Sequence, residues 1–164
     1  MLENLINLVK DNALDAVINN PAISNAQNGE VISETANSIV SGLKDHVSAG
    51  NLGDVMGLLQ GDHSVASLSS NPAISSIIQV LTTNLESKFG LPSSVTNGIA
   101  QQLIPTVMNQ LISKVKDPND ASFDIQSILS AVSGSGIDTG SLLGSLSGGS
   151  SEGIGGMLGG LFGK

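Results

Sequence analysis

Two aspartate-histidine pairs are the residues of this chain best suited to ligate a metal ion or to move a proton. Asp45 directly precedes His46, and Asp62 directly precedes His63. A carboxylate and an imidazole can share a metal ion when they converge on one point and neighbouring groups orient them. The first pair falls at the end of a predicted helix and the second in a predicted loop. We therefore expect solvated polar side chains and no metal site.

The stretch DPNDASFD, which begins at Asp117, has part of the pattern of a calcium-binding loop. Asp117 and Asn119 match the first ligands of such a loop. Ala121, Ser122 and Ile128 stand where the loop requires a further ligand, a glycine and a bidentate glutamate. We interpret the stretch as a turn that caps the helix after it.

Two glycine-rich stretches have parts of the patterns that hold a nucleophile or a phosphate group. In GSLSG, residues 144–148, Leu146 stands where the nucleophilic serine of a hydrolase turn would stand. Near Lys164, Leu158 occupies the first glycine position of a phosphate-binding loop. No group of residues predicts catalysis, so we expect a protein that is not an enzyme and has no cofactor.

Charge and aromatic content argue against nucleic acid as a partner. The formal net charge is −8, and all six positive residues are lysines. Arginine, which binds phosphate through a two-pronged fork, is absent. The only aromatic residues are three phenylalanines, so base stacking and sugar platforms are also poorly supported.

The compartment is predicted from what the sequence lacks. The chain contains no cysteine, which excludes disulfides but is compatible with either redox setting. Glu3 stands where a secretory signal needs positive charge, and Lys10 and Asp11 interrupt the first apolar run. No stretch reaches the roughly 18 consecutive apolar residues of a transmembrane helix. We expect a cytoplasmic protein with no transmembrane segment.

Apolar residues at helical spacing predict an all-α, compact multi-helical domain over residues 1–133. A first stripe covers the N-terminal residues, a second runs from Ile32 to Val47, a third follows Ile74, and a fourth extends from Val95 to Val115. Pro105 lies inside the last stripe, where we expect a bend with both arms packed. The predicted core comprises Leu5, Val9, Ile39, Leu43, Ile78, Leu81, Leu103, Val107 and Leu111.

The sequence NPAIS occurs twice, at residues 20–24 and 71–75. Asparagine can cap a helix, and proline fits its first position, so the motif predicts a helix start in both copies. The first helix should be short, because the turn pair Asn28-Gly29 follows it. The second should be long and should stop at Gly90.

The two halves of the domain each contain a long helix, a polar turn and a short helix with an acidic residue near its start. Residues 39–43 align with 107–111, and residues 54–59 align with 124–129. Internal duplication explains the match, and so does chance similarity between amphipathic helices.

The stretch ESKFGLPSSVTNGIAQQLIPTVMNQL resembles the YidB-like family of bacterial proteins of unknown function. The resemblance rests on Phe89-Gly90-Leu91, on Ser93, Ser94 and Thr96, and on the run from Ala100 to Pro105 with Val107 after it. It is strongest over residues 70–135 and loose in the N-terminal third. It implies an all-helical domain with a Gly-rich C-terminal end, and it implies no activity.

Residues 134–164 form a Gly/Ser-rich tail whose composition alone indicates disorder. Its periodicity indicates short amphipathic helical segments, because large apolar residues line one side of residues 153–163 and six glycines line the other. The glycines cost a helix about 5 kcal/mol, whereas burying the apolar side chains returns about 7 to 15 kcal/mol. A helix is therefore expected only on docking. The predicted docking residues are Ile154, Met157, Leu158, Leu161 and Phe162.

These patterns favour a non-enzymatic interaction or self-assembly protein whose C-terminal segment docks on the parent domain or on a neighbouring copy. The neighbour is preferred, because a second helix could approach the glycine face closely. The partner would be the chain itself, as a homo-oligomer, or another protein. The main alternative is a carrier of an apolar small molecule or lipid in the helical core. A weaker one is an enzyme whose site has no recognisable pattern.

Overall fold

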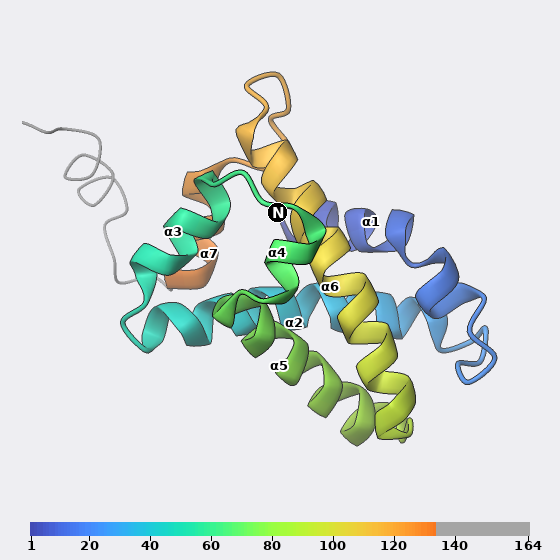
Figure 1. Cartoon of the computed structure of the whole chain (residues 1–164). Helices are drawn as coiled ribbons and strands as arrows, with labels where there is room; N and C mark the ends of the chain where they lie inside the picture. Colours follow the sequence, from blue (N-terminus) through green and yellow to red (C-terminus); the bar gives the residue numbers. More distant parts are fainter. Residues whose placement is uncertain (134–164) are drawn as a thin grey trace, which may run out of the picture.

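The computed structural model describes residues 1–133, which form an all-α, multi-helical fold (Figure 1). Seven α-helices and one π-helical turn, η1, make up this part of the chain, and it contains no strand. The elements are α1 (Leu2–Asn12), η1 (Leu14–Ile18), α2 (Asn28–Ser48), α3 (Leu52–Gln60), α4 (Val65–Ser69), α5 (Pro72–Phe89), α6 (Ser93–Lys116) and α7 (Ile125–Ser133).

Two long helices, α2 and α6, organise the fold. They cross in Figure 1, and α1, η1, α3 and α5 each pack on both of them. The most extensive helix pair is α2 with α5, followed by α5 with α6. The short helix α4 lies against α5 and α6, and α7 lies against α2. The two longest apolar stripes of the sequence therefore become the two central helices, as broad stripes predict.

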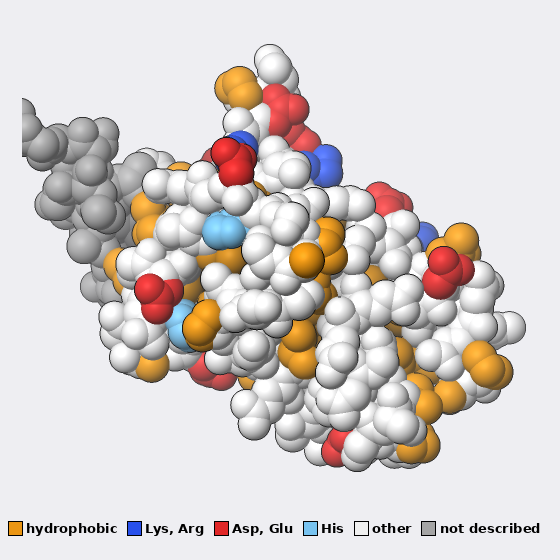
Figure 2. Space-filling model, viewed as in Figure 1, with side chains coloured by type: hydrophobic (Ala, Val, Ile, Leu, Met, Phe, Trp, Pro, Cys, Tyr) orange, Lys and Arg blue, Asp and Glu red, His pale blue; other side chains and the backbone are white. Residues whose placement is uncertain are grey.

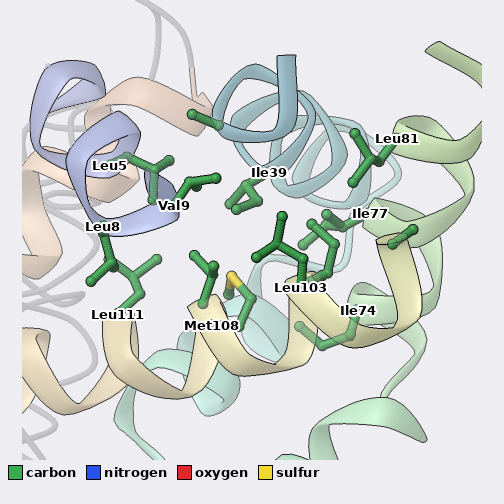
Figure 3. Close-up of a cluster of buried hydrophobic side chains, with 14 of the residues drawn as sticks. Leu5, Leu8, Val9, Ile39, Ile74, Ile77, Leu81, Leu103, Met108 and Leu111 are labelled. Atoms are coloured by element: carbon green, nitrogen blue, oxygen red, sulfur yellow. The ribbon is translucent and has the colours of Figure 1, made fainter. Parts of the chain in front are cut away.

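The core is one continuous cluster of aliphatic side chains from every helix (Figure 3). Of the nine predicted core residues, eight are buried. Ile78 is only partly buried and packs at the edge of the cluster, because the neighbouring Ile77 takes the fully buried position on α5. Only four polar or charged residues among those described are buried, namely Glu34, Thr35, Ser38 and Thr96.

Small residues let α2 and α5 approach closely. A Cβ atom added to Gly42 of α2 would lie 2.9 Å from the Cα atom of Ile77 on α5. Further along the pair, Asn84 Nδ2 donates a hydrogen bond to the buried Ser38 Oγ at 3.2 Å. One residue larger than glycine at position 42 would push the two helix backbones apart.

The N-terminal apolar stripe is helical, but it divides into α1 and η1. Its buried residues Leu5, Val9, Ala13 and Val17 follow at steps of four. Steps of four overshoot a turn of 3.6 residues, so a straight α-helix would rotate the last of them out of the core. The wider turn of η1 compensates for this drift and leaves Leu14 exposed.

The first NPAIS copy does not start a helix, so that prediction was wrong. Residues 20–27 form successive turns, and α2 begins at Asn28. The Asn28-Gly29 pair, predicted to be a turn, is instead the start of α2. The second copy does start α5, with Asn71 as N-cap and Pro72 in the first helical position.

The other predicted boundaries agree closely with the structure. Gly90 follows α5 in the left-handed conformation, with φ 63°, and α6 starts at Ser93. Helix α6 continues through Pro105, and its neighbours Leu103 and Val107 are both buried. Helices α3 and α7, which include residues 54–59 and 125–129 of the aligned stretches, have nine residues each.

Those two short helices start differently. Asp124 precedes α7 and accepts a hydrogen bond from the Ser127 N–H at 2.8 Å. Asp54 lies within the first turn of α3, and the expected cap Asn51 makes no side-chain capping bond.

None of the helices described between residues 1 and 133 has the length and apolar character needed to cross a membrane.

Candidate functional site

The five predicted docking residues lie outside the described part of the chain. They are Ile154, Met157, Leu158, Leu161 and Phe162, and the structure describes residues 1–133. The features of the described domain that could receive a ligand or a partner include two surface hollows with different walls, together with the two histidines.

His46 is not the solvated side chain that the sequence predicts. It lies in the last turn of α2, and its side chain is only 10% exposed. Helix α3 folds back over that turn and brings Asp54 Oδ2 to 3.6 Å from His46 Nε2. Asp45, its neighbour in sequence, is exposed. The acidic group near His46 is therefore supplied by α3 and not by the adjacent residue.

The second pair borders a polar hollow of about 250 Å³ near the C-terminal end of α6. Asp62 is exposed and is paired with Lys116, whose ammonium group lowers the pKa of that carboxyl through a hydrogen bond and its charge. Asn109 Nδ2 donates to the His63 carbonyl oxygen at 2.7 Å and so holds the loop against α6. The same hollow is lined by Asp117 and Ser113.

These polar residues form hydrogen bonds that hold loops in place. Within residues 1–133, no three histidine, aspartate or glutamate side chains gather closely enough to hold a metal ion. His63 Nε2 is 3.4 Å from the carbonyl oxygen of Gly57 in α3, a contact between that helix and the loop that follows it. The hollow can accept water or a small polar molecule through hydrogen bonds.

The stretch that begins at Asp117 is a capping turn, as predicted. Asp117 Oδ1 accepts from the Asn119 N–H and Asp120 Oδ1 from the Ser122 N–H, both at 2.9 Å. A hydrogen bond from Lys114, with those from Ser122, lowers the pKa of Asp120 to about 2. Each of these carboxylates is thus engaged by donors of the protein itself.

A second hollow, of about 540 Å³, is an open groove between the start of α2 and the end of α5, which we call the α2/α5 groove. Its wall is more apolar than polar, in contrast to the hollow beside His63. The groove is lined by Ala26, Gly29, Glu30, Ser33, Glu34, Asn37, Lys88 and Phe89.

One ion pair lines this groove. Lys88 Nζ on α5 is 2.7 Å from Glu34 Oε2 on α2, and the glutamate side chain is only 11% exposed. A buried carboxylate needs such a partner, because leaving it unpaired costs several kcal/mol. The aromatic ring of Phe89, partly buried against the core, stands beside the pair.

The α2/α5 groove was not predicted from the sequence. The available signal was a row of small or polar residues, Ala26, Gly29, Ser33 and Asn37, at steps of three and four. The row was not recognised, because Asn28-Gly29 was interpreted as a turn that interrupts the helical pattern. Phe89 was considered as part of the family resemblance and not as the wall of a groove.

No family model matches the chain, and no curated protein and no solved structure is similar to it. The resemblance to the YidB-like family therefore stays a prediction.

Proposed function

We propose that the chain is a cytoplasmic, non-enzymatic interaction or self-assembly protein that docks through residues 153–162. The docking face consists of Ile154, Met157, Leu158, Leu161 and Phe162. The partner that this proposal favours is a second copy of the chain.

The observation that carries the proposal is that residues 1–133 bury an extensive apolar core of their own. The last described helix, α7, buries Ile128, Leu129 and Val132, and it packs on α2. Side chains of the core are largely at zero exposure, from Leu5 at one end of the sequence to Val132 at the other. We therefore assign the five apolar residues of the tail to a contact with a partner.

The surface of the domain also suits contacts between proteins. Charged residues make up only 12% of the chain, and in Figure 2 they are scattered over a face that is mostly uncharged. The centres of protein interfaces are depleted of charged residues, because charge must be stripped of water on association. Helices of this domain can therefore meet another copy with little desolvation of charge.

Light scattering over a range of concentrations tests the proposal. We expect the full chain to have a mass above the 16.5 kDa of one copy, and that mass should rise with concentration. Deleting residues 135–164 should leave a folded domain of monomeric mass. A full chain that stays monomeric at high concentration contradicts self-assembly.

A matched pair of variants tests the role of the docking face. Replacing Leu158 and Leu161 by serine should lower the measured mass, because it removes two of the five apolar side chains. Replacing Leu142 and Leu143 by serine removes the same two side chains from the same tail, outside the docking face. Equal effects of the two pairs would contradict docking through residues 153–162.

A further inference from the structure

The α2/α5 groove has the dimensions of a site for one short helix. Its wall follows α2 from Gly29 to Asn37, eight residue steps, or about 12 Å at 1.5 Å per residue, and continues to Ala26 in the turn before the helix. Residues 153–162 would form a helix of about 15 Å. The groove volume of about 540 Å³ lies within the range of sites that bury several apolar groups.

The side chains of the two surfaces are complementary in size. The groove wall combines small side chains at Ala26, Gly29 and Ser33 with the polar and charged side chains of Glu30, Glu34, Asn37 and Lys88 and with Phe89. Small residues on one helix leave room for the large side chains of another. The apolar face of residues 153–162 carries large side chains only, at steps of three and one.

The chain between the two surfaces is long enough to join them within one molecule. Helix α7 ends at Ser133 and packs on α2, towards the C-terminal end of α2 in Figure 1, whereas the groove is at the start of α2. The length of α2 is about 32 Å. The twenty residues 134–153 can span up to about 66 Å. A tethered segment has an effective concentration in the millimolar range, which favours its own domain over a neighbour.

We infer that the α2/α5 groove holds residues 153–162 of the same chain, an inference that rests on the proposed function because it uses the same docking face but places that face on its own domain in place of a second copy. The apolar side chains then enter the groove, and the six glycines face outward. That glycine face becomes the surface on which a second copy can approach closely.

Cross-linking of introduced cysteines tests this inference in the full chain, which has no cysteine of its own. One variant carries Ser33→Cys in the groove and Gly163→Cys directly after the docking face. The control carries Ser75→Cys with Gly163→Cys, and Ser75 lines a different hollow of about 390 Å³. With a short bismaleimide, we expect the groove pair to link within one chain at least about tenfold faster than the control pair.

A substitution that fills the groove provides a second test. A Cβ atom at Gly29 meets no neighbour within 4 Å, so Gly29→Leu should fold normally and occupy the groove. Gly53 is likewise the second residue of its helix and has equal space, which makes Gly53→Leu the matched control. Gly29→Leu should slow the Ser33→Cys link about tenfold, and Gly53→Leu should leave its rate unchanged.

The outcomes separate this inference from the proposed function. Equal linking rates at Ser33 and Ser75 overturn the groove as the docking site, even if light scattering shows self-assembly. Links that join two chains place the segment on a neighbour and overturn docking within one chain. An apolar small molecule that copurifies with the protein, is seen by native mass spectrometry and is lost in Gly29→Leu also overturns it.

Discussion

At Asn20 and at Asn71, the side-chain oxygen accepts a hydrogen bond from the N–H two residues on, at 3.0 and 2.9 Å. In both NPAIS copies the isoleucine is buried. Beyond it the copies differ, since residues 24–27 form a turn whereas α5 continues to Phe89. Identical residues thus make the same local contact and enter different structures.

The residues that follow each motif explain the difference. Three, four and seven positions after Ile74 come Ile77, Ile78 and Leu81, which continue an apolar face into the core. The same positions after Ile23 hold Ala26, Gln27 and Glu30, and none of them is buried. A cap can start a helix, but most of the stability of a helix comes from packing an apolar face.

The largest expected effect is at the two isoleucines. Ile74→Ala should lower the free energy of unfolding by about 4 kcal/mol, because it leaves a cavity inside a helix pair that cannot collapse. Ile23→Ala should cost about 2 kcal/mol, since the turn around it can relax into the space. Urea denaturation of both variants measures the difference. Equal costs would show that the turn is packed as rigidly as α5.

Disrupting the close contact between Gly42 of α2 and Ile77 of α5 should give the next largest effect. Gly42→Ala should destabilise the protein by about 2 kcal/mol, because its Cβ atom would lie 2.7 Å from Ile77 Cγ1 and would force the helices apart. The higher helix propensity of alanine offsets part of this cost. Thermal unfolding compares it with wild type, and a stabilised variant would contradict the contact between α2 and α5.

Substitution by aspartate should affect stability differently at Asn20 and at Asn71. Asn20 also donates through Nδ2 to the Ala16 carbonyl oxygen at 3.1 Å, and Asn20→Asp loses that donor at a cost of about 1 kcal/mol. Asn71→Asp keeps the capping oxygen at a helix start, so stability should change by less than about 0.5 kcal/mol. Denaturation curves at neutral pH measure the stability of both variants. A larger loss of stability in Asn71→Asp than in Asn20→Asp would contradict the roles assigned to the two side chains.

The smallest expected effect concerns the glycine that follows the first copy. Gly29→Ala should stabilise the protein by about 0.5 kcal/mol, since Gly29 is helical with open space at Cβ. Gly90→Ala, after the helix of the second copy, should destabilise it by about 1 kcal/mol because φ there is 63°. A loss of stability in Gly29→Ala would indicate that Gly29 lies in a turn, as the sequence predicts, and not in α2.

The sequence predicts most of this fold, because its stripes are long and each apolar face has a partner. The positions of α2, α5 and α6, the stop at Gly90 and eight of nine core residues follow from spacing alone. It fails at residues 20–29, where local turn and cap patterns conflict with packing on α1 and α5. Burial of His46 was not predictable either, since it depends on how α3 folds back.

The α2/α5 groove was beyond sequence reasoning for a similar reason. It arises where the end of one helix meets the start of another that lies 54 residues away, as the Lys88 and Glu34 pair marks. Small residues predict close approach, but spacing alone does not indicate which helix approaches. Only the arrangement of α2 and α5 shows that the row from Ala26 to Asn37 is left open.

Amide hydrogen exchange of the full chain tests the central claim, docking through residues 153–162, most directly. We predict that the amides of residues 154–162 exchange at least about tenfold more slowly than those of residues 141–150 in the same tail. Replacing Leu158 and Leu161 by serine should abolish that protection. Unprotected exchange throughout residues 141–162, in a sample whose mass stays at 16.5 kDa, would contradict the account.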